Sequence, residues 1–332
     1  MKHPHLRATV APLMGALVLI GFSACNKDKG QAVPTAAGPP DLRAPFQSWP
    51  NSPAAPVAST PEIVALGERL YHETALSKGG DVSCATCHAL DNFGQDGKKV
   101  SSGTSGLLGK RNAPTSINAF RQFAQFWDGR ADSVETQSTM PMLTDVEHGL
   151  VSEDQIVEIL QGVGDYPAAF AKAFGASDQL ALTADNVRAA IGAFERTLVT
   201  HSPFDAWLDG DDNALSAEQK KGLETFVASG CTMCHSGRAV GGGMFQKLGL
   251  VKAVETEDLG RFQVTGNEAD KYMFKVPTLL NIERTGPYMH DGRFDSLEEA
   301  IRFMGDVQLG KALSDEDVKS IAVFLGALTG TR

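Results

Sequence analysis

The sequence predicts an all-α protein made of two helical domains of the same design, joined by long loops. Three observations lead to this prediction: the pattern Cys-x-x-Cys-His occurs twice, an amphipathic helix is predicted before each copy, and another is predicted at the end of each half. A chain of 332 residues with 42% hydrophobic content is long enough for about two domains. The expected N-terminal domain covers 61–199, and the expected C-terminal domain covers 200–332.

The first 25 residues are expected to direct export. Lys2 and Arg7 precede an apolar stretch over 8–22 that is too short for a comfortable membrane span, which is typical of a signal peptide. The stretch ends in "FSAC", a pattern that favours a lipid anchor on Cys25 as in bacterial lipoproteins, although Phe22 departs from the usual aliphatic residue. Simple cleavage and an uncleaved anchor are the alternatives. The expected location is the periplasm, with membrane attachment if Cys25 is lipidated.

Residues 26–60 are expected to form a flexible linker. They are rich in Pro, Ala and Ser, and they carry too little periodic apolar content to offset the chain entropy lost on folding. The formal net charge of −10 over the whole chain argues against a nucleic-acid partner and is compatible with a basic protein partner.

Helical spacing of apolar residues is repeated around both motifs. Residues 61–77 show this spacing ahead of the first motif, and 215–235 follow the same plan and end at the second. Each half closes with a further amphipathic segment, predicted over 183–200 and 313–330. The apolar stripes are interpreted as core-packing faces. Three of these helices have expected N-caps, at Thr183, Ser216 and Ser314.

The paired cysteines allow three chemistries: a redox dithiol, a Cys₄ zinc site, or covalent attachment of c-type haem. In haem attachment the two thiols add to the vinyl groups and the adjacent His binds iron, so Cys-x-x-Cys-His is its specific signature. Zinc would not require His at the same place twice, and a thioredoxin-like pair needs a βαβ setting. The sequence therefore favours two covalently bound haem c groups. The expected attachment residues and proximal iron ligands are Cys84, Cys87 and His88, and Cys231, Cys234 and His235.

From about residue 61 to 330 the chain resembles the bacterial dihaem cytochrome c peroxidases, a family that also contains the MauG-type dihaem oxidases. The resemblance is carried by "LSKGGDVSCATCH", "GKRNAPTSINAF", "QFWDGRADSVETQ", "VEHG" and "PYMHDGRFDSLEEAIRFMGDVQLG". It implies an enzyme, a cytochrome-c peroxidase that reduces H₂O₂ to water with electrons from a small redox protein, either a cytochrome c or a cupredoxin. The N-terminal haem would meet peroxide, and the C-terminal haem would store and relay an electron. Family members are often homodimers.

The resemblance also assigns residues. Met304 matches the distal ligand of the C-terminal haem, where MauG-type proteins have Tyr, so Met304 favours the peroxidase branch. Gln137 and Glu147 match an amide and a carboxylate beside the N-terminal haem, where an amide can hold peroxide and a carboxylate can move its proton. Trp127 matches the residue that bridges the two haems.

Two further inferences rest on the same resemblance. Many members keep a displaceable distal His on the N-terminal haem, but the matching residue here is Thr104. We therefore expect an enzyme that needs little or no priming reduction. A Ca²⁺ site between the domains is implied, with Asn112, Thr285 and Pro287 as ligands. A MauG-like oxidase and a dihaem electron-transfer cytochrome without a substrate are the alternatives, and the Gln137 and Glu147 pair speaks against the second of these.

Overall fold

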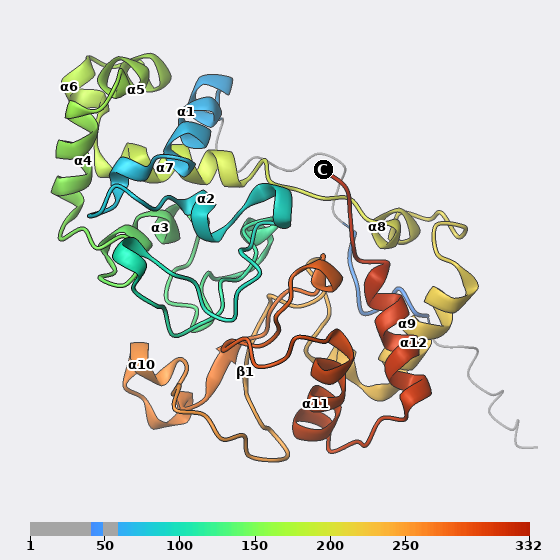
Figure 1. Cartoon of the computed structure of the whole chain (residues 1–332). Coiled ribbons are helices and arrows are strands. Elements are labelled where there is room, and N and C mark those ends of the chain that lie inside the picture. The colour runs from blue at the N-terminus through green and yellow to red at the C-terminus, as the bar shows by residue number, and fades with distance from the viewer. Residues whose placement is uncertain (1–40, 49–58) are drawn as a thin grey trace, which may run out of the picture. The chain divides into compact units, whose positions relative to one another are not determined.

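The computed structural model describes residues 41–48 and 59–332, and Asp41–Arg332 form one compact unit. This unit is mostly helical, with long loops and a small sheet (Figure 1), so the predicted helical class is confirmed. The expected signal peptide, Cys25 and most of the expected linker lie outside the described residues. In the part of the chain that the structure describes, no helix is long and apolar enough to cross a membrane.

The first half of the described chain, residues 61–199, contains seven helices, and the second half is residues 200–332. They are α1 (Pro61–Tyr71), α2 (Cys84–Cys87), α3 (Val134–Thr139), α4 (Glu153–Gly162), α5 (Tyr166–Phe174), α6 (Asp178–Ala181) and α7 (Ala184–Glu195). Helix α1 is shorter than the segment expected over 61–77, because the chain leaves the helix at His72 and forms a separate 3₁₀ turn, η1 (Thr74–Leu76). Thr183 caps α7 as predicted, by accepting a hydrogen bond from the Asn186 N–H.

The second half repeats this plan. Its helices are α8 (Pro203–Leu208), α9 (Ala217–Ser229), α10 (Phe262–Thr265), α11 (Leu297–Leu309) and α12 (Asp315–Gly326). The predicted caps are confirmed, since Ser216 and Ser314 each form a capping box with the side chain three residues later.

In each half, the helix that precedes the Cys-x-x-Cys-His motif crosses the last helix at a glycine. Helix α1 packs on α7, and α9 packs on α12 (Figure 1). A Cβ atom added at Gly67 would lie 1.9 Å from the Ala190 carbonyl oxygen, and one added at Gly222 would lie 2.1 Å from the Ser320 carbonyl oxygen. Only glycine permits so close a crossing, so the two halves use the same packing solution.

Each half has its own hydrophobic cluster among the described residues. One cluster collects buried side chains from α1, α4, α5 and α7, including Leu66 and Ile191. The other collects buried side chains from α8, α9, α11 and α12, including Leu223 and Phe324. The two clusters share no residue.

Thr200 joins the halves at the expected boundary between them. Its Oγ1 accepts hydrogen bonds from the side-chain amides of Asn118 at 2.9 Å and Asn281 at 3.0 Å. Both asparagines are fully buried and have positive φ angles of 61°. They occupy matching places in "PTSINAF" and "PTLLNIE", so this junction is built from the same residue of each repeat.

A two-stranded antiparallel sheet, which the sequence did not lead us to expect, lies in the second half. Strands β1 (Phe245–Lys247) and β2 (Met273–Lys275) pair with Phe245 opposite Lys275. Each strand has three residues, which is too short to produce a recognisable alternating pattern. The expectation of a purely helical protein is corrected on this point.

Residues 41–48 fall within the expected flexible linker, yet they are docked on the second half. Phe46 is 6% exposed and packs edge-on against Phe204, with ring centroids 5.1 Å apart. Arg43 lies over the Trp207 ring at 4.1 Å and donates a hydrogen bond to the Trp207 carbonyl. An aromatic ring and a stacked guanidinium bury enough surface to hold a segment whose average composition suggests none.

Candidate functional site

The first Cys-x-x-Cys-His motif is folded by a short capped helix. Thr86 accepts a hydrogen bond from the Ser83 N–H at 2.9 Å, which starts α2, and the His88 N–H donates to the Cys84 carbonyl at 2.9 Å. The His88 ring therefore follows directly on the turn that carries both thiols. Its Nδ1 lies 3.2 Å from the Gly94 carbonyl, and its Nε2 has no hydrogen bond within the described chain. An imidazole oriented through Nδ1 presents Nε2 as a metal ligand.

Tyr71 holds this motif in place through a hydrogen bond to its backbone, and it was not identified from the sequence. Its hydroxyl donates to the His88 carbonyl at 2.7 Å and lies 3.0 Å from Ser116 Oγ. The side chain is fully buried, and burial raises its pKa well above the ordinary value. The sequence offered only a tyrosine at the end of a helix, which is a common core residue.

Glu147 lies near both thiols of the first motif. Burial raises the pKa of Cys84 to about 12, and the charges of Glu195 and Glu147 add to the shift. Burial also raises the pKa of Cys87, again with a contribution from Glu147. Glu147 itself is partly buried, and its carboxylate has no hydrogen bond or ion pair within the described chain. Burial raises the pKa of Glu147, and the charge of Arg130 opposes this.

The neighbouring carboxylate, Glu135, has a different environment. Both of its oxygens accept hydrogen bonds from Arg196, the residue directly after α7, at 2.7 and 2.9 Å, so Glu135 fixes α3 to the end of α7. Gln137 follows two residues later on α3 and is partly exposed. Its side chain makes no hydrogen bond within the described chain, so its amide is available to a ligand.

Thr104 is buried and its hydroxyl is occupied. Oγ1 donates to Asp81 Oδ1 at 2.8 Å and accepts from the Gly79 N–H at 2.9 Å. Its backbone N–H donates to the Glu147 carbonyl at 2.7 Å. The residue expected in place of a displaceable His is therefore a structural contact of the loop that carries it.

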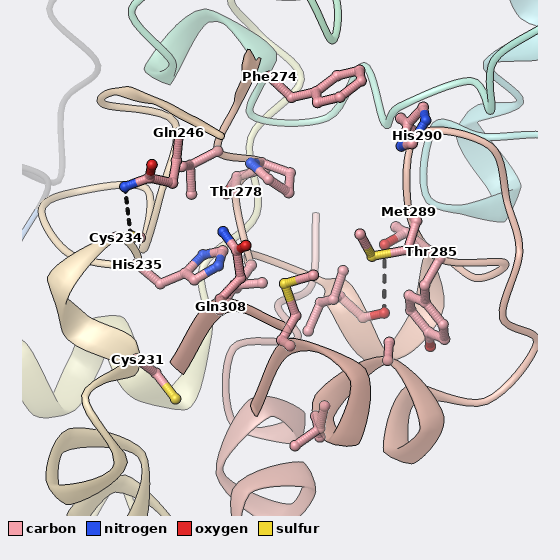
Figure 2. A pocket seen from close by; sticks show the side chains of 18 of the residues that line it. Cys231, Cys234, His235, Gln246, Phe274, Thr278, Thr285, Met289, His290 and Gln308 are labelled. Atoms are coloured by element: carbon pink, nitrogen blue, oxygen red, sulfur yellow. Dashed lines mark hydrogen bonds between the residues drawn. The ribbon is translucent and has the colours of Figure 1, made fainter. Parts of the chain in front are cut away.

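The second motif opens onto a cavity of about 230 Å³ with mostly apolar walls. Cys231 begins a 3₁₀ turn, η6 (Cys231–Met233), and the His235 N–H donates to the Cys231 carbonyl at 2.9 Å. Figure 2 shows Cys231, Cys234 and His235 on one side of this cavity and Thr285 and His290 on the other.

The His235 ring is uncharged at neutral pH, and one of its nitrogens has no hydrogen-bond partner among the described residues. Burial lowers the pKa of His235 to about 4, and the nearby carbonyls of Val240 and Pro277 offset part of the shift. Its Nδ1 has no partner in hydrogen-bond geometry within the described chain. A neutral imidazole is the form that binds metals.

Met304 lies on α11 and lines the same cavity as His235. The internal repeat identifies its counterpart in the first half, because Pro141 follows Trp127 by the same interval as Met304 follows His290. Proline has no side-chain donor atom, and the next residue, Met142, is 1% exposed in the hydrophobic core. The position that supplies a thioether in one half therefore supplies no ligand in the other.

Trp127, Asn112 and His290 lie together where the two halves meet. The Trp127 indole N–H donates to the Asn112 carbonyl at 2.9 Å, and the Asn112 N–H donates to the His290 carbonyl at 2.8 Å. The Trp127 and His290 rings are 6.3 Å apart in an edge-on arrangement. Asn112, Trp127 and His290 also line the cavity, as do Thr285 and Pro287. The structure thus brings the expected bridging residue and the expected calcium ligands to one region.

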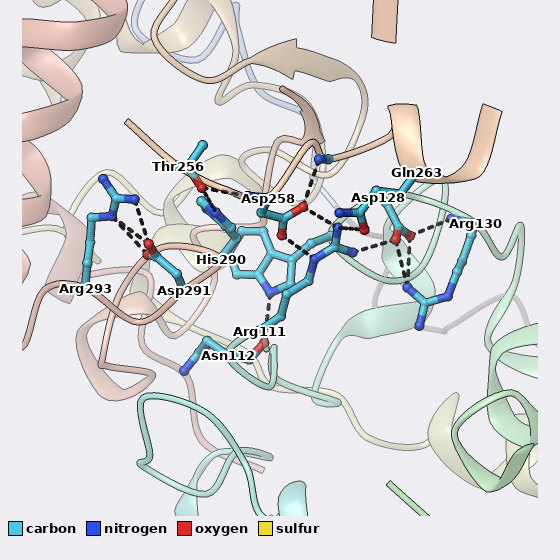
Figure 3. A network of polar contacts seen from close by, with 12 residues as sticks. Arg111, Asn112, Asp128, Arg130, Thr256, Asp258, Gln263, His290, Asp291 and Arg293 are labelled. Carbon is cyan, nitrogen blue, oxygen red and sulfur yellow. Dashed lines mark hydrogen bonds and ion pairs between the residues drawn. The ribbon is translucent and has the colours of Figure 1, made fainter. Parts of the chain in front are cut away.

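An ion-pair network beside Trp127 was not found by sequence reasoning (Figure 3). Arg111 binds Asp128 of its own half and both carboxylate oxygens of Asp258 in the other half. Arg130 also binds Asp128. This pairing could not be predicted from the sequence, because Arg111 and Asp258 are far apart along the chain.

Lys275 is another residue that the sequence did not identify. It is 5% exposed, lines the cavity, and donates to the Gln122 side chain. Burial lowers the pKa of Lys275 to about 7. A lysine amine is unusual in the wall of a cavity that is mostly apolar.

The residues present fit covalently attached haem better than the alternatives. Each motif has two thiols one helical turn apart and a partly buried imidazole with a nitrogen that makes no hydrogen bond within the described chain, and the second motif also shares a mostly apolar cavity with a thioether. No three or more His, Cys, Asp and Glu side chains of the described residues gather into a metal-binding group. The four cysteines therefore do not converge, and the Cys₄ zinc alternative is wrong.

Comparisons with known proteins agree with this arrangement. A family model described as di-haem cytochrome c peroxidase matches residues 61–213. The cytochrome c551 peroxidase of Nitrosomonas europaea is 43% identical over 288 residues, which cover 84% of this chain and 85% of that protein. The cytochrome c551 peroxidase of Pseudomonas aeruginosa is 42% identical, with 80% and 78% covered.

MauG-type proteins are also similar to the chain. The methylamine utilization protein MauG of Methylorubrum extorquens is 39% identical, with 77% of this chain and 71% of that protein covered. A solved structure of a MauG-like protein associated with microbial copper homeostasis has a TM-score of 0.72 and 26% identity, and covers 86% of this chain and 93% of that one.

A helical fold with a repeated plan and one Cys-x-x-Cys-His motif in each half defines a dihaem c-type protein. The chain belongs to the dihaem cytochrome c peroxidase family. The resemblance stated from the sequence is confirmed, and the predicted class of enzyme is that of the family.

Proposed function

We propose that this protein is a peroxidase that reduces H₂O₂ to two water molecules, with two electrons from a small redox protein and two protons from solvent. The observation that carries the proposal is Glu147 beside the first motif, a partly buried carboxylate that has no ion pair with any residue the structure describes. An electron-transfer cytochrome without a substrate needs no such group. The relatives from Nitrosomonas and Pseudomonas are cytochrome c551 peroxidases, which supports the same reaction.

Cys84, Cys87 and His88 would hold the peroxide-binding haem of an N-terminal domain over 61–199. The second haem, in a domain over 200–332, would be held by Cys231, Cys234, His235 and Met304. When bound, the haems supply one-electron redox chemistry and an iron atom open to peroxide. A His and Met pair raises the reduction potential, which suits the relaying haem.

Glu147 would take a proton from peroxide and return it to the leaving oxygen, and Gln137 would orient the peroxide by hydrogen bonds. The raised pKa of Glu147 suits this task, because a base works best when its pKa approaches the working pH. Trp127 would carry electrons between the halves, supported by its position against His290.

The first haem would need no ligand displacement. Thr104 is bound to Asp81 and Gly79, and Pro141 stands at the repeat position of Met304. Neither offers iron a strong ligand, so peroxide would reach the resting enzyme without prior reduction.

A Ca²⁺ ion between the halves is part of the proposal. The carbonyls of Thr285 and Pro287 accept no hydrogen bond within the described chain, and they line the same cavity as Asn112. Unpaired carbonyl oxygens and an amide are typical calcium ligands. Calcium would stabilise the contact between the halves. Export to the periplasm, a lipid on Cys25, a homodimer, and a cytochrome c or cupredoxin donor complete the proposal.

A MauG-like oxidase is the second candidate, because a MauG protein is 39% identical. Met304 distinguishes the two, since the oxidase branch is expected to place Tyr there.

The test is peroxide turnover by the haem-loaded enzyme, as isolated and after pre-reduction, with the dye ABTS as electron donor. We expect activity without pre-reduction, and a loss of about 10²- to 10⁴-fold in kcat/KM for Glu147→Gln. Glu158→Gln, which changes an exposed carboxylate on α4, should leave turnover unchanged. Undiminished turnover by Glu147→Gln would refute the assignment.

A further inference from the structure

The loop that carries Thr104 is bound on one side by a single carboxylate. Asp81 Oδ1 accepts a hydrogen bond from Thr104 Oγ1 at 2.8 Å, and Asp81 Oδ2 accepts one from the Ser105 N–H at 2.9 Å. These two bonds hold the pKa of Asp81 below its ordinary value, so the carboxylate is charged at neutral pH. The Asp81 N–H is in turn fixed to Ser77 Oγ at 3.1 Å.

On its other side the same loop lies against the turn that carries Glu147. The Thr104 N–H donates to the Glu147 carbonyl at 2.7 Å. A Cβ atom at Gly103 would lie 2.0 Å from the Val146 carbonyl oxygen and 2.5 Å from that of Glu147. The contact is backbone against backbone, so a shift of the loop moves Glu147 with it.

The segment before Cys84 also holds the Glu147 turn directly. The Lys78 N–H donates to the His148 carbonyl at 2.8 Å, and His148 Nδ1 lies 2.6 Å from the Leu76 carbonyl. Hydrogen bonds therefore join three segments into one assembly: residues 76–81, 103–105 and 144–149. Because Asp81 stands three residues before Cys84, this assembly connects the first haem-attachment motif to Glu147.

We propose that Asp81 is a positioning residue that fixes Glu147 relative to the first Cys-x-x-Cys-His motif, by binding the Thr104 loop through both of its carboxylate oxygens. The proposal rests on the function proposed for Glu147. On this proposal the Thr104 loop supports Glu147 throughout turnover and does not move to open the site to peroxide. The loop is part of the support of the proton-transfer group and remains in place through turnover.

The test is a set of haem-loaded variants assayed for peroxide turnover. Asp81→Asn keeps the shape of the side chain but leaves one acceptor oxygen for two donors, Thr104 Oγ1 and the Ser105 N–H. Thr104→Val removes the hydroxyl with little change in the volume of the side chain. Each is expected to lower kcat/KM about ten- to hundred-fold, because small misplacements of a catalytic group have effects of this size. Thr104→Ser keeps the hydroxyl and should restore most of the turnover. Asp91→Asn changes an exposed carboxylate three residues after His88 and should have no effect.

A second measurement separates positioning from general damage. Asp81→Asn should accelerate amide hydrogen exchange at Ser105 and Glu147 while both haems stay attached, and it should add no further loss in a Glu147→Gln background. An equal loss in that background, or wild-type turnover by Asp81→Asn, would overturn the proposal. If Glu147→Gln alone keeps full turnover, the function assigned to Glu147 is wrong and the proposal falls with it. Faster exchange at Ser105 in Asp81→Asn would still show that the loop is bound as described.

Discussion

Arg111 is the side chain whose loss should most weaken the contact between the two halves. Its side chain is 18% exposed, and those of its partners Asp128 and Asp258 are 5% and 17% exposed. It binds Asp258 through two parallel hydrogen bonds of 2.6 and 2.8 Å (Figure 3). Replacing Arg111 with Met keeps the volume of the stem and removes the charge, which leaves Asp258 buried without its ion-pair partner.

Removing one member of a buried ion pair costs about 3–5 kcal/mol of the free energy of unfolding. Asp128 would still be neutralised by Arg130, through bonds of 2.9 and 3.1 Å. We therefore expect the lower end of the range, about 3 kcal/mol. Urea unfolding of the haem-loaded protein at pH 7, followed by far-ultraviolet circular dichroism, measures this loss.

A matched control is the exposed pair of Lys221 and Glu316, whose side chains are 63% and 78% exposed. Lys221→Met should cost less than about 1 kcal/mol. If Arg111→Met costs no more than this control, the network is a surface feature and the reasoning is wrong.

The loss of stability caused by Arg111→Met should also depend on pH. Burial raises the pKa of Asp258, but the hydrogen bonds from Arg111 outweigh it and hold the pKa below the ordinary value of 3.8. A carboxylate whose pKa is lower in the folded than in the unfolded state stabilises the fold when the pH is above its unfolded-state pKa. This stabilisation is lost as the pH falls through its folded-state pKa. The difference in stability between wild type and Arg111→Met should therefore shrink below about pH 4.

Three further predictions follow from single contacts. Arg130→Gln removes a charge that lowers the pKa of Glu147, so the acid limb of the pH profile of kcat/KM should move to higher pH, whereas Arg130→Lys should leave it near wild type. Gly222→Ala places a Cβ atom 2.1 Å from a backbone oxygen and should cost about 1–3 kcal/mol or more in urea unfolding, while Gly162→Ala, with open space at its Cβ, should be neutral. Thr200→Val leaves two buried asparagine amides without their shared acceptor and should cost about 2 kcal/mol. A loss below about 0.5 kcal/mol would show that these hydrogen bonds do not stabilise the junction.

The helices that bound the site could be predicted because their signals are local. Ser216 and Ser314 each precede an apolar stripe and are followed three residues later by a side chain that completes a capping box. The two Cys-x-x-Cys-His motifs are likewise continuous in sequence. Such features need no knowledge of what packs against them.

The remaining features depend on contacts between distant residues. The strands β1 and β2 have three residues each, and their pairing joins segments separated by a long loop. The cavity around His235 collects residues from both halves, and the cation Lys275 in its wall resembles any exposed lysine when only the sequence is known. The role of Asp81 is equally hidden in the sequence, because the hydrogen-bond partners of its carboxylate, Thr104 and Ser105, stand more than twenty residues away.

The internal repeat explains how one design can give two different sites. Both halves contain the same turn, closed by an ion pair between Asp128 and Arg130 in the first half and between Asp291 and Arg293 in the second. A capped helix follows each turn, but α11 continues to Leu309 whereas α3 ends at Thr139.

Pro141 accounts for this difference. Proline has no N–H to donate to the preceding turn of a helix, so α3 cannot continue through it, and the chain forms the 3₁₀ turn η5 (Pro141–Leu143) instead. The residues that follow are then free to fold into the turn that presents Glu147, which the Glu147 N–H closes by donating to the Thr144 carbonyl at 2.9 Å. In the second half the unbroken helix carries Met304 into the cavity instead. One helix-terminating residue therefore leaves the first half without the thioether that the second half has at the matching position, and it creates the backbone on which Glu147 stands.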